Sequence, residues 1–180
     1  MSTKTTKGAK PMNTNNNNTA TRRPRLSYYH ANARGTGAAV NFELHPATLE
    51  AEGSILMEIA AQNSPGKVAA DGAAMLPRFD WGEKIAVRLC MPDLCGLLQV
   101  LRGYYESIAD GRGLFHRTME ANIKIAFWHR IDPIPGYVLE VYAKPHDGDE
   151  RRASITFSPS EAVGLCCAIE MSMGRVAFGV

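Results

Sequence analysis

The chain has 180 residues, of which 45% are hydrophobic and 21% are charged, and this is ordinary for a globular protein with one sizeable core. It contains no apolar run approaching the roughly 18 residues of a membrane-spanning helix, and no apolar signal segment. We therefore expect a soluble, intracellular protein without a membrane partner. The cytoplasm or nucleoid is the predicted compartment, and the mitochondrial matrix is the alternative.

The net charge of +2 conceals an uneven distribution. Residues 1–25 carry six basic residues and no acidic one, so 14 basic residues face 18 acidic ones in the remainder, which is formally −4. This Thr- and Asn-rich segment has too little apolar surface to fold. We predict a disordered basic tail over residues 1–25, with organelle targeting as the alternative interpretation, and one domain over 26–180. A polyanion would have to be held by locally arranged cations plus the tail.

The first half of the predicted domain contains four candidate strands and a helix. The strands are expected at 26–33, 38–45, 54–61 and 84–90, where apolar and polar residues alternate. A Gly/Ala/Pro-rich loop over residues 63–77 is long for a compact domain. The helix is predicted to begin at Pro92, because proline suits the first helical turn, and to end before about residue 110.

The second half repeats this plan. Strands are predicted at 114–119, 122–131, 137–144 and 151–157, and a helix follows at Ser158-Pro159-Ser160-Glu161, which has the pattern of a capping box. We therefore predict an α+β fold built from a duplicated β4–α unit. Its two antiparallel four-stranded sheets each place one face against a common core, and two helices complete it.

The sequence contains no motif typical of catalysis or of cofactor binding. Phosphate-binding glycine loops and the His-Glu-x-x-His pattern are missing, and the five histidines are scattered without metal-ligand spacing. The four cysteines, Cys90, Cys95, Cys166 and Cys167, form no Cys-x-x-Cys pair and are interpreted as buried reduced thiols, with disulfides or metal ligands as the alternative. We expect no cofactor, no metal and no enzymatic activity.

Aromatic and basic residues recur on the predicted outward sides of the strands. Such a surface suits single-stranded nucleic acid, because bases stack on rings while cations contact phosphates. Trp128 is the predicted main stacking residue, and packing of Trp128 and Tyr142 under a helix or in a subunit interface is the alternative. The predicted nucleic-acid-binding residues are Tyr28, His30, Arg34, Lys84, Arg88, Lys124, Trp128, Arg130, Tyr142 and Lys144.

The two predicted helices carry more apolar surface than sheets of this size should leave uncovered. A surplus of this kind indicates association between copies of a chain. The predicted oligomerisation residues are Leu94, Leu97, Leu98, Leu101, Val163, Cys167 and Met173.

Several segments resemble the Whirly family of single-stranded-DNA-binding proteins. Residues 34–40, which read Arg-Gly-Thr-Gly-Ala-Ala-Val and lead to Glu-Leu-His-Pro at 43–46, are similar to its Lys-Gly-Lys-Ala-Ala-Leu strand. Thr36 stands where the family has its second lysine. Residues 53–61 resemble its third strand, and Phe79-Asp80-Trp81 resembles its Tyr/Phe-Asp-Trp strand entry. The last strand, the capped helix and Gly174 also follow the family, so that the resemblance spans roughly residues 28–178.

The resemblance implies a homotetramer with its helices at the centre and single strands lying across the sheets. It also implies single-stranded DNA binding with little sequence specificity, in DNA maintenance or transcription. The related kinetoplastid mitochondrial RNA-binding proteins make RNA binding or annealing the alternative. A structural subunit of a larger assembly is the second alternative.

Overall fold

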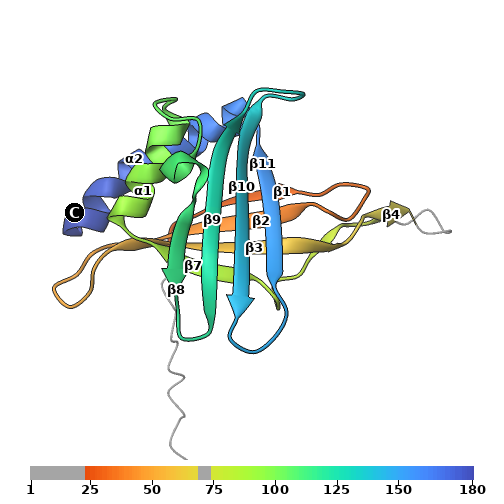
Figure 1. Ribbon diagram of the computed structural model, residues 1–180, viewed down its shortest axis with the longest axis horizontal. Coiled ribbons are helices and arrows are strands. Elements are labelled where there is room, and N and C mark those ends of the chain that lie inside the picture. The colour runs from red at the N-terminus through yellow and green to blue at the C-terminus, as the bar shows by residue number, and fades with distance from the viewer. Residues whose placement is uncertain (1–22, 69–73) are drawn as a thin grey trace, which may run out of the picture.

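The computed structural model describes residues 23–68 and 74–180 (Figure 1). The predicted tail therefore lies outside the described residues, except for its last three positions. Arg25 already belongs to the first strand, one residue before the predicted start of the domain.

The first sheet is antiparallel, with its main strands in the order β1-β2-β3-β7. These strands are β1 (Arg25–His30), β2 (Ala38–His45), β3 (Ser54–Ser64) and β7 (Ile85–Leu89). The short β6 (Arg78–Phe79) pairs with the last residues of β3, whereas β7 pairs with the first part of the same strand. A separate small hairpin consists of β4 (Lys67–Val68) and β5 (Ala74–Met75), and it projects away from the body of the molecule (Figure 1).

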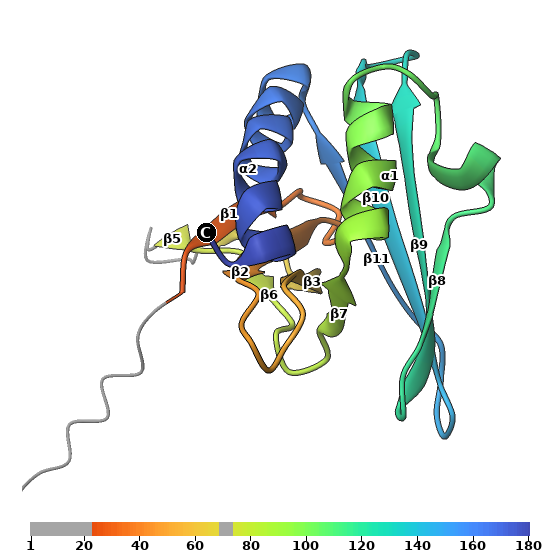
Figure 2. The ribbon, with the colours of Figure 1, turned by 90° about the vertical axis from the view of Figure 1, so that its left-hand side faces the viewer.

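The second sheet is also antiparallel and has the order β11-β10-β9-β8. Its strands are β8 (Leu114–Arg117), β9 (Ala121–Arg130), β10 (Gly136–Pro145) and β11 (Arg151–Phe157). They cross the strands of the first sheet at a steep angle (Figure 1). Each sheet is followed by a helix, α1 (Met91–Leu101) or α2 (Pro159–Phe178), and the two helices lie side by side (Figure 2). A short 3-10 helix, η1 (Ile108–Gly111), precedes β8.

This architecture confirms the predicted fold class, because two units of four strands and a helix follow each other along the chain. The bounds of β2 and β11 agree with those predicted from the sequence. None of the helices in the described part of the chain is long and apolar enough to cross a membrane.

Local side-chain hydrogen bonds fix the start of each helix. The Ser158 hydroxyl accepts a hydrogen bond from the Glu161 amide at 3.3 Å, and the Glu161 carboxylate accepts one from the Ser158 amide at 2.8 Å. Asp93 caps α1 in the same way by accepting a hydrogen bond from the Cys90 amide at 2.8 Å. Gly179 ends α2 with a φ of 77°, a left-handed conformation that costs glycine little. These caps fix where each helix meets the end of its sheet.

The core lies between the two sheets and the helices. Phe157 is completely buried at the junction, where the ring of Tyr28 meets it edge-on at a centroid distance of 5.0 Å. The leucines of α1 belong to the same core, since Leu94, Leu97 and Leu98 are at most 8% exposed. The structure thus corrects the placement of these leucines, which are covered by their own chain and are not available for contacts between subunits.

A different part of the helices carries exposed apolar side chains. Val163 is 64% exposed, Met171 84% and Phe178 79%. Cys167 is exposed between the first two, and Cys90 and Cys95 on or beside α1 are exposed as well, so the predicted burial of these thiols is wrong. The residues at 163, 167 and 171 are four apart and so share one face of α2. We call Val163, Cys167, Met171 and Phe178 the α2 stripe. Leu101 and Met173, by contrast, are half-buried and pack against the core.

Candidate functional site

The outer face of the second sheet presents an alternating row of aromatic and basic side chains. In the strand register Phe115 of β8 lies opposite Lys124 of β9, Lys124 lies opposite Tyr142 of β10, and Tyr142 lies opposite Arg152 of β11. One residue from each strand thus forms a line across the whole sheet. We call Phe115, Lys124, Tyr142 and Arg152 the aromatic–cation row.

Within the row, each cation lies over a neighbouring ring. The Lys124 Nζ atom is 5.5 Å from the centroid of the Phe115 ring, and the Arg152 Cζ atom is 5.0 Å from that of Tyr142. Both distances are within the range of cation–π attraction. Phe115 is nonetheless 71% exposed, so most of its ring surface is free to contact a ligand.

A buried carboxylate holds one end of the row in place. Glu140 is only 8% exposed, and it accepts hydrogen bonds from Arg152, through Nε at 2.8 Å and through Nη2, and from the Tyr142 hydroxyl. The hydrogen bond to Glu140 is the main cause of the raised pKa of Tyr142, and partial burial adds to it. The same carboxylate raises the pKa of Arg152. Ring and guanidinium are therefore oriented before any ligand arrives.

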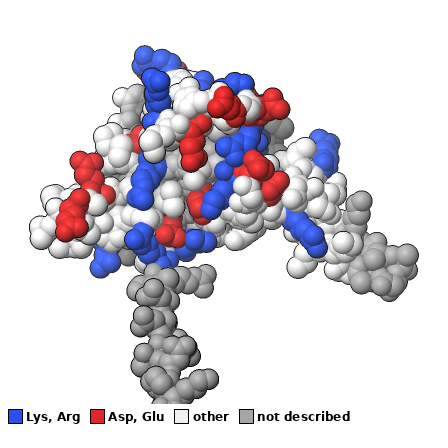
Figure 3. Space-filling view, turned by 90° about the horizontal axis from the view of Figure 1, so that it is seen from below, with Lys and Arg blue, Asp and Glu red and all other residues white. Residues whose placement is uncertain are grey.

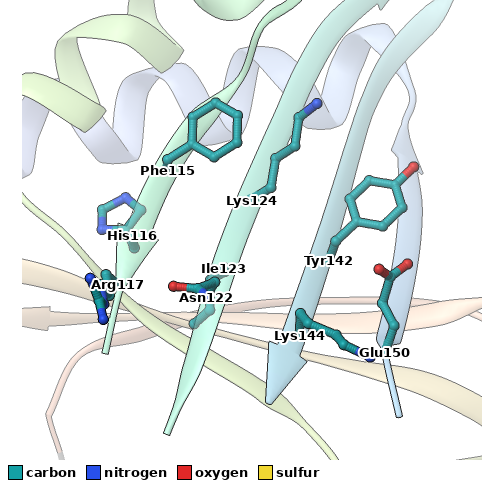
Figure 4. A pocket seen from close by; sticks show the side chains of 9 residues that line it. All are labelled: Phe115, His116, Arg117, Asn122, Ile123, Lys124, Tyr142, Lys144 and Glu150. Carbon is teal, nitrogen blue, oxygen red and sulfur yellow. The ribbon is translucent and has the colours of Figure 1, made fainter. Parts of the chain in front are cut away.

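An open hollow of about 570 Å³ lies beside the row (Figure 4). This volume is within the range of about 300–1,000 Å³ that is typical of small-ligand sites. Figure 4 shows Phe115 and Tyr142 on either side of Lys124, with Lys144 below Tyr142 and Glu150 to its lower right. The residues that line the hollow are Phe115, His116, Arg117, Asn122, Ile123, Lys124, Tyr142, Lys144 and Glu150.

Trp128 lies on the same outer face but outside this hollow. It faces Val138 on β10 and pairs through its backbone with Ser107, which precedes η1. Its half-buried side chain lines a second hollow of about 300 Å³, together with Lys124, Tyr142 and the segment around η1. Its role as the main stacking residue stays a prediction. Arg130 lies at the far end of β9, where its Nε donates to the Ile134 carbonyl at 3.0 Å.

Two of the predicted binding residues face the interior of the protein. The Tyr28 hydroxyl donates to the Glu161 carbonyl at 3.2 Å, and the His30 Nε2 atom is 2.7 Å from the Glu161 carboxylate, so both point toward α2. The expected outward orientation of Tyr28 and His30 is therefore wrong. Apolar or aromatic residues occupy both faces of β1, where Leu26 points inward and Tyr29 outward. The sequence therefore shows no difference in polarity between the two faces that would identify the buried one.

The predicted cations of the first sheet are mostly engaged with its own side chains. Lys84 is 2.5 Å from Glu58, and Arg88 donates to the Ser54 hydroxyl at 3.2 Å. Arg25 forms a further ion pair with Glu43 at 2.8 Å. Figure 3, which views the molecule from below, shows acidic and basic side chains interspersed. Arg34 is exposed in the turn between β1 and β2, apart from the aromatic–cation row.

The structure adds residues that sequence reasoning missed. Phe115 and Arg152 complete the row, and the alternation within β8 and β11 could have placed them on its face. Tyr29, Phe79 and Trp81 form a separate aromatic cluster on the first sheet, with Tyr29 58% exposed and its ring 5.8 Å from Phe79 and 6.5 Å from Trp81. The row arises from the pairing of four consecutive strands, whereas the cluster gathers Tyr29 of β1 with Phe79 of β6 and Trp81, which are far from Tyr29 in the sequence.

No protein-family model and no curated protein sequence matches this chain. Several solved structures, however, match it in fold. WHY1 from Arabidopsis thaliana superposes with a TM-score of 0.67 at 14% identity, covering 87% of this chain and 86% of that one. MRP1/MRP2 from Trypanosoma brucei gives 0.58 at 14% identity over 86% of each chain. The plant transcriptional regulator PBF-2 gives 0.57 at 15% identity over 87% and 84%.

Identities this low establish a common fold and leave the activity to be argued from the site. The coverage extends over nearly the whole described part of the chain. This confirms the resemblance to the Whirly family at the level of structure: the chain shares the fold of Whirly proteins and of trypanosome MRP1/MRP2.

Proposed function

We propose that the protein binds single-stranded nucleic acid across the outer face of its second sheet and catalyses no reaction. The aromatic–cation row is the observation that carries this proposal. Adjacent strands lie about 4.7–4.9 Å apart, so that Phe115 and Tyr142, two strands apart, offer separate rings with Lys124 between them. Two bases can stack on these rings while Lys124 contacts the phosphate between them.

The distribution of free cations favours the second sheet over the first. Within the described residues, Arg117, Lys124 and Lys144 on the second sheet form no ion pair with a carboxylate, and Arg152 pairs with Glu140. On the first sheet Lys84 and Arg25 are paired with carboxylates and Arg88 is not. A cation already paired with a protein carboxylate must exchange that partner to contact a phosphate. The domain is formally negative, so local cations of this kind, together with the six basic residues of segment 1–25, have to supply the attraction.

We further propose DNA as the ligand, with a role in DNA maintenance or transcription, and a homotetramer assembled through the α2 stripe. The structural likeness to the plant transcriptional regulator PBF-2 supports a DNA partner. RNA is the alternative, because rings and cations bind both polymers and only a contact to the 2′-hydroxyl group would distinguish them. Exposed apolar residues in a line along one helix support association between subunits.

Titration of fluorescently labelled oligo-dT and oligo-rU of equal length tests this function. We expect saturable binding of both with a preference for oligo-dT, and an affinity that falls steeply with salt. Lys124→Ala should reduce the slope of log affinity against log salt by roughly 0.7, the contribution of one phosphate contact in a single strand. A preference for oligo-rU would support the RNA alternative. Failure to bind either polymer would refute the function and leave a structural subunit as the alternative.

A further inference from the structure

We propose that the hollow beside the aromatic–cation row is a subsite that selects a guanine base within the bound strand. The inference rests on the proposed function, since the base would be delivered by a single strand lying along the row. Lys144 and Glu150, which both line the hollow and lie toward its Tyr142 side, would read the edge of the base (Figure 4).

Glu150 is the carboxylate in this region that remains open to a ligand. It is exposed, and among the described residues it makes no hydrogen bond and no ion pair. Glu140, by contrast, already accepts hydrogen bonds from Arg152 and from Tyr142. The Glu150 charge lies near these same two residues, because it contributes, after the larger effect of Glu140, to the raised pKa of each. Glu150 can therefore accept hydrogen bonds from a base that stacks on Tyr142.

Lys144 supplies a donor beside this carboxylate. It is two residues beyond Tyr142 on β10 and so projects from the same face of the strand. Its Nζ atom is 3.4 Å from the Gly148 carbonyl, at the limit of a hydrogen bond, and a better acceptor could displace this contact. The hollow thus offers both a donor and a carboxylate with two acceptor oxygens to a base.

This combination complements guanine better than any other common base. The Watson–Crick edge of guanine presents the O6 acceptor and then the N1–H and N2–H donors, which are two adjacent donors for one carboxylate. Adenine and cytosine present one donor group beside an acceptor, and thymine or uracil places a single donor between two acceptors. A charge-assisted bidentate contact to a carboxylate is strong and geometrically specific. Tyr142 would support the ring of the base while Lys144 and Glu150 read its edge.

The test compares oligo-dT with the same oligomer carrying a single central guanine, adenine, cytosine or hypoxanthine. We expect the guanine oligomer to bind the wild-type protein about tenfold more tightly than oligo-dT, as one good bidentate contact provides. Hypoxanthine lacks the 2-amino group but keeps N1–H and O6, so it should fall between guanine and thymine. Glu150→Gln should abolish the preference for guanine over thymine, and its affinity for oligo-dT should match that of Asp149→Asn, which removes the same charge.

Asp149→Asn is the matched control. It removes the same charge at the neighbouring position in the sequence, and Asp149 does not line the hollow. It should keep the preference for guanine. Equal binding of all the oligomers by the wild-type protein would overturn the guanine subsite while leaving the proposed function intact. A preference that survives Glu150→Gln, or that disappears equally in Asp149→Asn, would also overturn it. Failure of oligo-dT itself to bind would refute the function and the subsite together.

Discussion

Removing both rings of the aromatic–cation row, by Phe115→Ala combined with Tyr142→Ala, should weaken the binding of oligo-dT at least thirtyfold. A base stacked on an aromatic side chain contributes about 1–3 kcal/mol. Contributions of neighbouring rings need not add, so we expect a total loss of at least about 2 kcal/mol, which is roughly thirtyfold in Kd. Fluorescence anisotropy titration at fixed salt concentration measures this loss.

The fold should tolerate this double substitution. Phe115 is 71% exposed, and Glu140 keeps its hydrogen bonds to Arg152 when the Tyr142 hydroxyl is removed. Tyr104 and Tyr105, 68% and 52% exposed beyond the end of α1, provide the matched control, and replacing both by alanine should leave affinity unchanged. Unaltered binding by the row variant would show that the strand does not cross this face. A large loss in Tyr29→Ala with Trp81→Ala instead would move the site to the first sheet.

Two charges placed in the α2 stripe should dissociate the proposed tetramer. Val163→Glu together with Met171→Glu puts a carboxylate at two positions that are 64% and 84% exposed in the single chain. A carboxylate forced into an apolar contact without a partner costs several kcal/mol, and in a symmetric assembly each substitution is repeated in every subunit. Light scattering should give a tetramer mass for the wild-type protein and a smaller mass for the variant.

Two exposed apolar residues away from the helices provide a control for the general effect of adding two negative charges. Leu49→Glu with Ile134→Glu adds the same two charges in loops, where the native side chains are fully exposed and 67% exposed, respectively. This control should keep the tetramer mass, and both variants should unfold cooperatively. A monomer mass for the wild-type protein at micromolar concentration, or a tetramer that survives the stripe substitutions, would exclude assembly through α2.

Strand positions could be predicted from the sequence wherever alternation was clear. β2 and β11 agree with their predicted bounds because apolar residues on one face contrast with polar residues on the other. In β1, Leu26, Tyr28 and Tyr29 place apolar or aromatic surface on both faces, and the orientation of Tyr28 and His30 was predicted wrongly. Alternation therefore locates a strand better than it identifies its buried face.

The helices show a second limit of sequence patterns. The stripe from Leu94 to Leu101 correctly indicated one apolar face on α1, but periodicity does not reveal what covers such a face. The two crossed sheets, η1 and α2 bury most of it within the same chain. The apolar residues that remain exposed lie on α2, where Val163 and Cys167 were among the predicted residues and Met171 and Phe178 were not.

The candidate site could be predicted only in part, for a geometric reason. Lys124 and Tyr142 were recognised as outward-facing residues, whereas Phe115 and Arg152 were not. The row depends on the register between four strands, which brings together residues 115, 124, 142 and 152. The alternation of one strand determines which face a side chain occupies, but not which residue of the next strand lies beside it. The hollow that contains Glu150 depends on this register and on the loop that precedes β11.

Photochemical cross-linking tests most directly whether a single strand lies along the aromatic–cation row. An oligo-dT in which 5-iodo-deoxyuridine replaces thymidine is irradiated in complex with the full-length protein, and the modified residues are mapped by mass spectrometry. Iodouracil couples preferentially to aromatic side chains on which it stacks, so we expect adducts at Phe115 and Tyr142 that decrease when unlabelled oligo-dT competes. Competable adducts confined to Tyr29 and Trp81 on the first sheet, with Phe115 and Tyr142 unmodified, would contradict binding along the row.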